Sequence, residues 1–369
     1  MHLPRILHIF NNDKIVKDTI TLFNKVTEYK QSFIIISNDV EKIEGSYSDI
    51  ENLELIEQNS ELIEKLRRKI DGFDIVFLQA LSYPKAKLLA KNKFKNTIFI
   101  WGLWGYELYN YVYYKKRVER NSISFIQKLK DYYTFNIIYK RAFKKINYAL
   151  FLLEYDYNLL KDNAKTKAKW LPGSYQTIEQ INEHFPNFKV AGNSILVGNS
   201  STSSNNHFLI FDKISSIREK KIICPLNYGD LNYQREVIIA GNNIFNDDFF
   251  PLVEFLPLKD YLEIIKECGV TIFAHERQQA FGTIIQMLYA GSKVFLSNKS
   301  PLYGYCIDNG FYVYSVEDDL DINSAVPLEE ALALKNREIA TSVFSEKYVL
   351  ERKVKMFKRL EQEFYEQSR

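Results

Sequence analysis

Short apolar runs alternate with longer, more polar stretches along the whole of this chain, and this alternation most limits the folds open to it. Most runs are continuously apolar and rich in β-branched or aromatic residues, which is typical of parallel strands buried on both faces. The stretches between them suit helices, so two batches of runs predict two doubly wound, Rossmann-like α/β domains. The predicted strands span residues 5–10, 32–37, 73–79, 97–102 and 148–153 in the first half, and 194–199, 221–226, 252–257, 269–274, 293–298 and 311–315 in the second.

The 369 residues are comfortable for two such domains. We expect the first domain to span residues 1–172, because Pro172 and Gly173 interrupt the pattern there, and a polar linker to span 173–192. The second predicted domain spans 193–344. The final segment, 345–369, is charged and amphipathic and predicts a helix, which in architectures of this type often crosses back onto the first domain.

Composition argues against several classes of protein. A net charge of +3 is too small to indicate a nucleic-acid-binding protein. Cys224, Cys268 and Cys306 lack C-x-x-C spacing and are expected to be buried, reduced thiols of a cytosolic protein. The histidines lack metal-ligand spacing, so we expect no zinc site. We also expect no cofactor. We see no signal peptide and no apolar run of about 18 residues, which favours a soluble protein or one on a membrane surface.

The most informative stretch is 271–291, where an apolar strand leads into a polar cluster and then into an apolar helix. The helix is predicted to open at Gly282-Thr283 and to stop at Gly291. Its first N–H groups and the nearby Arg277 suit an anion such as the diphosphate of a nucleotide sugar. An ordinary strand–turn–helix with a surface salt bridge explains the same pattern equally well. The cluster consists of His275, Glu276, Arg277, Gln278 and Gln279.

A second candidate loop opens the second domain, at 194–208, where a buried strand ends in small hydroxyl and amide residues. We expect its N–H and hydroxyl groups to contact a phosphate or sugar at the carboxyl edge of the sheet, although helix capping accounts for part of this composition. No G-x-G-x-x-G fingerprint and no G-x-x-x-x-G-K-[ST] loop is present, so nicotinamide chemistry and NTP hydrolysis lose support. Further along, Tyr228 is a candidate for stacking on a base or for a structural role. The candidates in the loop are Gly198, Asn199, Ser200, Ser204, Asn205 and His207.

In the first domain two places follow buried strands. Asp13 ends the sequence Asn11-Asn12-Asp13, and Trp104, Gly105 and Glu107 follow residues 97–102. We expect Asp13 and Glu107 to face a cleft between the domains, where either could accept a proton from an acceptor hydroxyl. A helix cap or a surface ion pair is the alternative for each.

The segment 109–146 differs in composition, because it carries ten basic and two acidic residues interleaved with Tyr and Phe. Such a segment can lie on an anionic bilayer, and Lys115, Lys116 and Arg117 are its candidate membrane-surface residues. A solvated helical face over an aromatic core is the alternative.

Taken together, three motifs resemble those of glycosyltransferase family 56: ILVGNS with SN-x-H (195–200 and 204–207), RQQ-x-x-GT (277–283) and WG-x-E-LY (104–109). PL-x-YG at 225–229 and the later Ala290, Gly291 and Pro301 fit as well. The resemblance covers most of the chain and is densest in its second half. Glu107 stands where the type member of the family has Asp, and the loop Ser201-Thr202-Ser203 also differs.

The resemblance implies a GT-B fold, in which two Rossmann-like domains face a cleft, and a donor site in the C-terminal domain. It also implies metal-independent transfer of a Fuc4NAc-like deoxy-amino sugar from a TDP-sugar to a polyprenyl-diphosphate-linked saccharide, on the cytoplasmic face of the inner membrane. By motif position Trp104, Gly105 and Glu107 lie on the acceptor side. The implied donor residues are the loop candidates given above together with Arg277, Gln278, Gln279, Gly282 and Thr283.

The expected chemistry breaks the bond between the sugar C1 and a diphosphate oxygen. Because no convincing D-x-D motif is present, we assign stabilisation of the leaving diphosphate to Arg277 and the helix start. Asp13 or Glu107 would act as the base if the reaction inverts configuration, whereas retention needs no dedicated carboxylate. A GT-B enzyme with another donor, such as a UDP-hexosamine, and a catalytically inactive scaffold subunit remain the alternatives.

Overall fold

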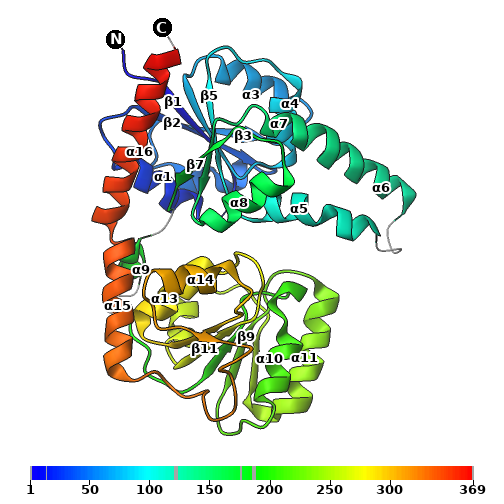
Figure 1. Ribbon diagram of the computed structural model, residues 1–369, viewed down its shortest axis with the longest axis vertical. Coiled ribbons are helices and arrows are strands. Elements are labelled where there is room, and N and C mark those ends of the chain that lie inside the picture. The colour runs from blue at the N-terminus through cyan, green and yellow to red at the C-terminus, as the bar shows by residue number, and fades with distance from the viewer. Residues whose placement is uncertain (1, 14, 120–123, 175–176, 185–187, 368–369) are drawn as a thin grey trace. The chain divides into compact units, whose positions relative to one another are not determined.

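The computed structural model of the protein describes residues 2–13, 15–119, 124–174, 177–184 and 188–367. The chain forms two compact units, one made of Met1–Tyr175 with Val349–Arg369 and the other of Gln176–Tyr348. Each unit holds one parallel sheet with helices on both of its faces (Figure 1). The predicted fold class, two doubly wound α/β domains, is therefore confirmed.

The first unit, called unit 1 below, has a seven-stranded sheet in the order β3-β2-β1-β4-β5-β6-β7. Its strands are β1 (Ile6–Asn11), β2 (Gln31–Ser37), β3 (Leu53–Glu57), β4 (Ile75–Gln79), β5 (Ile98–Gly102), β6 (Tyr148–Phe151) and β7 (Lys169–Pro172). Its helices are α1 (Val16–Asn24), α2 (Glu41–Glu44), α3 (Leu62–Ile70), α4 (Tyr83–Lys91), α5 (Tyr106–Glu119), α6 (Phe125–Tyr132), α7 (Lys140–Phe143) and α8 (Glu154–Asn163), with a π-helical segment at Tyr133–Tyr139.

Strand β1 shows how the apolar runs build the core of unit 1. Its side chains alternate between the two faces of the sheet, as the pleat requires. Leu7 and Ile9 belong to the cluster that contains α3 and α4, whereas Ile6 and Phe10 belong to the cluster that contains α1. Burial on both faces explains why the run is apolar without interruption.

The C-terminal helix α16 (Glu346–Gln367) completes the α1 face of unit 1. The ring of Phe357 lies 5.1 Å from that of Tyr29 and 5.9 Å from that of Phe77, measured between ring centroids. Lys353, which is buried in the same helix, donates a hydrogen bond to the backbone carbonyl of Ser174 at 3.1 Å. The last helix therefore belongs to the packing of the unit that begins the chain.

The second unit, called unit 2 below, has a six-stranded parallel sheet in the order β10-β9-β8-β11-β12-β13. Its strands are β8 (Ile195–Val197), β9 (Ile222–Pro225), β10 (Phe249–Leu252), β11 (Val270–Phe273), β12 (Lys293–Leu296) and β13 (Tyr314–Ser315). Its helices are α9 (Ile178–His184), α10 (His207–Ile214), α11 (Leu231–Phe245), α12 (Leu258–Ile265), α13 (Phe281–Ala290), α14 (Pro301–Asp308) and α15 (Glu330–Phe344).

The predicted strands inside each sheet agree with the structure to within two residues at either end, and the larger differences lie at the sheet edges. Strands β3 and β7 were not predicted, the strand expected at 252–257 lies instead at β10, and β13 is only the end of the predicted 311–315. Helix α9 lies within the segment that we expected to be a linker. An edge strand pairs on one side only and tolerates charge and proline, which removes the continuous apolar run.

The thiols of Cys224, Cys268 and Cys306 are buried and form no disulfide, as predicted. Burial raises their pKa values, that of Cys306 to about 12. No helix within the described ranges is both long and apolar enough to cross a bilayer.

Candidate functional site

The strand order of unit 2 reverses between β8 and β11, which are neighbours in the sheet. Chain segments leave the carboxyl ends of two such strands in opposite directions, and the crevice between them is where open α/β sheets bind ligands. Most of the residues that the sequence singled out lie in the two loops that follow these strands. The sequence could not show that these loops, about seventy residues apart, meet at one point of the sheet.

The loop after β8 is closed by Asn205, whose side chain is fully buried. Its Nδ2 donates to the backbone carbonyl of Ser200 at 2.9 Å and to that of Thr202 at 3.2 Å. Its Oδ1 accepts a hydrogen bond from the backbone N–H of Asn199 at 3.1 Å. Gly198 enters this loop with a φ of +66°, a conformation that glycine adopts without strain. The amide of Asn205 therefore fixes the loop's backbone.

Gln279 connects this loop to the one after β11. Its Oε1 accepts from the hydroxyl of Ser204 at 2.8 Å and from Nε of Arg277 at 3.0 Å. Its Nε2 donates to Oδ1 of Asn199 at 2.8 Å. One uncharged amide thus orients the guanidinium of Arg277 and holds it to the loop after β8. These four side chains are all among the sequence-predicted donor residues.

Asn206 makes a second connection between the two loops. Its Nδ2 donates to the backbone carbonyl of Ala274 at 2.6 Å, and its φ of 52° places it in the left-handed region, where Asn is tolerated better than most residues. Helix α10 begins directly after it, at His207. The start of α10 is thereby held against the end of β11.

Helix α13 begins at Phe281, one residue before the predicted Gly282, and ends at Ala290 before Gly291. Its N-cap residue, Ala280, has a φ of 57° and carries no polar side chain. The N–H groups of its first turn, which includes Gly282 and Thr283, therefore receive no side-chain hydrogen bond from the cap position. This helix start follows Gln279 directly, so its positive end lies beside the loop network.

The two histidines of the site are fully buried and neutral at physiological pH. Burial lowers the pKa of His207 to about 4, and its Nδ1 lies 3.1 Å from the hydroxyl of Tyr233. Burial, helped by the charge of Arg277, also lowers the pKa of His275 to about 4. Both imidazoles therefore lie uncharged in the interior and present no charge to solvent.

Two further predicted residues lie at the rim of these loops. The side chain of Tyr228 is 49% exposed, and its hydroxyl accepts a hydrogen bond from Nδ2 of Asn199 at 2.7 Å. Glu276 is exposed and pairs with Lys299 at 3.1 Å, as the surface-salt-bridge alternative expected. Gln278, which lies between Arg277 and Gln279 in sequence, is half-buried.

In unit 1, Asp13 follows β1 and is exposed, and its Oδ1 accepts from the N–H of Ile15 at 3.3 Å. Trp104 and Gly105 lead into α5, and Gly105 has a φ of 107°. We expected Glu107, like Asp13, to face a cleft, but Glu107 is buried and only 1% exposed.

Three donors explain the buried position of Glu107. Its Oε1 accepts from Nε1 of Trp101 at 3.1 Å and from the backbone N–H groups of Trp104 at 3.1 Å and Leu81 at 3.3 Å. Burial raises the pKa of this carboxyl, while the three donors act against that shift. The carboxyl group therefore joins the chain segments after β4 and β5.

Thr202, Asn206 and Tyr233 contribute to the loop network of unit 2 but were not among the predicted site residues. Nε2 of Gln279 donates to Oγ1 of Thr202 at 3.4 Å. Tyr233, which lies on α11, contacts Nδ1 of His207 through its hydroxyl. Thr202 and Asn206 lie inside the predicted loop, and their polar side chains are the only signal in the sequence that could have selected them. Nothing in the sequence connects Tyr233 to the site. The side chains of Lys115, Lys116 and Arg117 lie outside the described part of the structure. Within the described part, no cluster of three or more His, Cys, Asp or Glu residues could hold a metal ion.

Known structures share this architecture. Anabaena HepE in complex with UDP-glucose matches 97% of this chain and 100% of its own, with a TM-score of 0.66 at 9% identity. Sucrose-phosphate synthase from Thermosynechococcus elongatus matches 97% and 99%, with a TM-score of 0.64 at 10% identity. A glycosyltransferase from Rickettsia africae matches 98% and 99%, with a TM-score of 0.60 at 16% identity. At these identities the likeness shows the fold alone, which is GT-B.

The family is shown by the sequence itself. The profile of the 4-alpha-L-fucosyltransferases, glycosyl transferase group 56, matches residues 5–358, nearly the whole chain. The chain belongs to this family, as the motifs predicted, and is a glycosyltransferase.

Proposed function

We propose that the protein transfers a Fuc4NAc-like deoxy-amino sugar from a TDP-sugar to a polyprenyl-diphosphate-linked saccharide in bacterial surface polysaccharide biosynthesis. The family match and the three sequence motifs support this proposal. A UDP-sugar is the second candidate donor, because HepE, which shares the fold, was solved with UDP-glucose. The acceptor implies peripheral association with the cytoplasmic face of the inner membrane.

The network around Gln279 is the observation that supports the donor site best. It combines a guanidinium, hydroxyl and amide groups, and a helix start at the one point of the unit 2 sheet where the strand order reverses. These groups match the oxygens of a diphosphate and the hydroxyl groups of a sugar. We assign Arg277 and the first turn of α13 to the diphosphate, and Asn199, Ser204 and Gln279 to positioning.

In the proposed reaction, negative charge grows on the leaving diphosphate as the bond to the sugar C1 breaks. Fixed positive groups that are already oriented stabilise this charge without reorganising. Nε of Arg277 donates a hydrogen bond to Oε1 of Gln279, which orients the guanidinium before the donor arrives. For an inverting reaction we assign the base to Asp13, because its carboxylate is exposed whereas that of Glu107 is buried. For retention, the departing phosphate would accept the proton.

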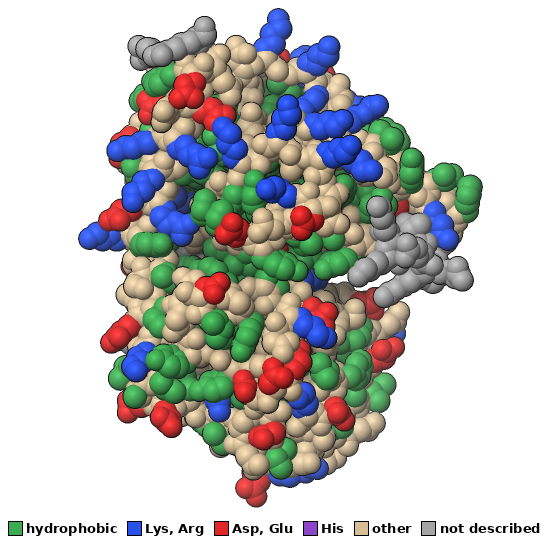
Figure 2. Space-filling model, in the orientation of Figure 1, with side chains coloured by type: hydrophobic (Ala, Val, Ile, Leu, Met, Phe, Trp, Pro, Cys, Tyr) green, Lys and Arg blue, Asp and Glu red, His purple; other side chains and the backbone are tan. Residues whose placement is uncertain are grey.

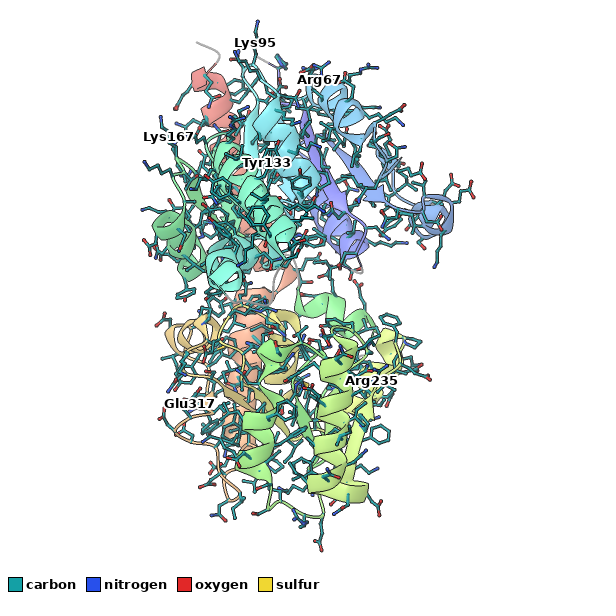
Figure 3. The ribbon with its side chains drawn as sticks, turned by 90° about the vertical axis from the view of Figure 1, so that its right-hand side faces the viewer. Arg67, Lys95, Tyr133, Lys167, Arg235 and Glu317 are labelled. Atoms are coloured by element: carbon teal, nitrogen blue, oxygen red, sulfur yellow. The ribbon has the colours of Figure 1, made fainter. Side chains whose placement is uncertain are left out.

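The test of this assignment is Arg277→Ala. We expect turnover to fall by about 10²–10³-fold, the usual effect of removing one oriented donor at a developing charge. Arg235→Ala is the matched control, since Arg235 is an exposed arginine on α11 of the same unit (Figure 3). Transfer is measured with TDP- and UDP-sugars and a panel of lipid-linked acceptors. Full activity of the Arg277 variant would refute the assignment, and the sugar nucleotide that raises the melting temperature identifies the donor class.

A further inference from the structure

Helix α6 exposes apolar side chains to solvent and buries a charged one, the opposite of the usual arrangement in a globular protein. Its apolar side chains face outward, at spacings that place them on one side of the helix. In contrast, Asp131 of the same helix is buried, and its Oδ1 accepts a hydrogen bond from Nε2 of Gln127 at 2.8 Å. The exposed fractions are 73% for Phe125, 66% for Ile126, 54% for Leu129 and 60% for Tyr132, and 44% for Tyr133, which follows the helix directly and continues the same face.

This apolar face lies on a projection of unit 1. Helices α5 and α6 extend away from the sheet of this unit (Figure 1), and hydrophobic side chains gather at the outer part of the projection (Figure 2). Figure 3 looks toward this side of the molecule and labels Tyr133. An exposed group of large apolar side chains is uncommon on a soluble protein and marks a surface that binds something.

Basic side chains accompany the apolar ones. Lys128 and Lys130 lie on α6 itself, and Lys140, Arg141 and Lys144 are exposed just beyond it. Residues 124–145 carry six basic and one acidic side chain, a net charge of +5. A second copy of this chain would bring an equal positive charge against the face, so self-association is disfavoured.

From these observations we infer that the outward face of α6 inserts into the headgroup region of an anionic lipid bilayer. Phe, Ile and Leu enter the acyl boundary, the tyrosines lie at the headgroup level, and the basic side chains pair with anionic lipids. The inference rests on the proposed lipid-linked acceptor, for which the bilayer is the place of encounter. The sequence pointed only to the basic residues Lys115, Lys116 and Arg117 as the membrane surface, whereas the exposed face of α6 adds the apolar side chains that would enter the bilayer.

The test uses the full-length protein with vesicles of phosphatidylethanolamine and phosphatidylglycerol, and with vesicles of phosphatidylcholine. A triple variant, Phe125→Ser, Ile126→Ser and Leu129→Ser, is compared with a control that removes three apolar side chains of unit 2 that are also about half exposed or more, Ile239→Ser, Ile322→Ser and Leu334→Ser. We expect the α6 variant to lose about tenfold or more in partition to the anionic vesicles, and the control to bind like the wild type. Binding should also weaken with salt and be weaker on phosphatidylcholine.

Equal loss in both triple variants, unchanged binding of the α6 variant, or no vesicle binding by the wild type would each overturn the inference. Self-association or capture of an acidic protein through α6, without vesicle binding, would overturn it as well. Transfer to a short-chain acceptor in detergent separates this inference from the proposed function. If the wild type transfers no sugar there but binds vesicles through α6, the proposed function fails while the docking surface stands.

Discussion

Gln279 and Asn199 lie 80 positions apart in sequence and are joined by a hydrogen bond of 2.8 Å between Nε2 and Oδ1. This bond joins the loop after β11 to the loop after β8, where the strand order of unit 2 reverses. The Oε1 of the same amide accepts from Arg277 and Ser204. The position of the guanidinium therefore depends on a neutral residue that carries none of the charge.

Replacing Gln279 tests this dependence. Gln279→Ala leaves Asn199, Ser204 and Arg277 without these hydrogen bonds, and we expect the free energy of unfolding to fall by about 1–2 kcal/mol. Gln279→Glu keeps both acceptor contacts but places a negative charge beside the proposed diphosphate site. We therefore expect Gln279→Glu to fold more stably than Gln279→Ala yet to bind a nucleoside diphosphate more weakly. Chemical denaturation and nucleotide titration measure the two effects, and equal nucleotide affinity in wild type and Gln279→Glu would contradict the site.

Gly198 provides a second test, because it enters the loop after β8 in a left-handed conformation. A Cβ added there would lie 2.7 Å from Nε2 of His207 and 3.1 Å from Oδ1 of Asn205. We expect Gly198→Ala to lower the free energy of unfolding by about 1–3 kcal/mol and to weaken nucleotide binding, since it displaces the residue that closes the loop.

Gly304 is the matched control for this substitution. It lies within α14, and apart from its chain neighbours and the backbone of its own helix, no atom lies within 4 Å of the position that its Cβ would occupy. Gly304→Ala should therefore stabilise the protein by about 0.5–1 kcal/mol, the usual difference between alanine and glycine in a helix. If both variants were equally stable, the strain assigned to Gly198 would be wrong.

The two carboxylates of unit 1 are distinguished by their amide variants. Asp13→Asn removes an exposed carboxylate, and in an inverting reaction we expect turnover to fall by about 10²–10⁴-fold with loss of the acidic limb of the pH–rate profile. Glu107→Gln keeps an acceptor oxygen for Trp101, Trp104 and Leu81, so we expect its turnover to change by less than about tenfold. Near-normal rates in both variants would show that no side-chain carboxylate of this pair acts as the base and would favour retention.

The interior of each sheet could be predicted from the sequence, whereas the edges could not. Strands such as β1 and β11 are buried on both faces and therefore appear as uninterrupted apolar runs. Edge strand β3 carries Glu54 and Glu57, and edge strand β10 contains Pro251, which breaks the run. The strand predicted at 252–257 was misplaced because the next apolar run along the chain begins at the end of β10.

Polarity at strand ends marked much of the candidate site, because parallel strands bring their carboxyl ends to one edge. It could not show which polar residue faces inward. Asn205 and Glu107 both look like surface residues in the sequence, yet both are buried and fix the backbone of neighbouring segments. Their roles depend on hydrogen-bond partners elsewhere in the chain, which a local sequence pattern does not show.

Asp156 on α8 offers a test through pH. Its carboxyl group is fully buried and accepts a hydrogen bond from the hydroxyl of Tyr109 at 2.6 Å. Burial raises its pKa to about 7 from an ordinary value of 3.8, although the bond from Tyr109 opposes the shift. Between these two values the folded protein keeps the proton that the unfolded chain releases. The free energy of unfolding should therefore fall as pH rises through this window, by about 1.4 kcal/mol per pH unit at most, and level off above it.

Asp156→Asn removes this proton-linked loss and can still accept the bond from Tyr109 through its amide oxygen. We expect the variant to gain stability relative to the wild type as pH rises from about 4 to about 7, with a constant difference above that range. Tyr109→Phe should extend the window upward, because it removes a donor that favours the ionised carboxylate. Denaturant unfolding at a series of pH values measures all three proteins, and parallel curves for wild type and Asp156→Asn across this range would show that Asp156 ionises normally in the folded state.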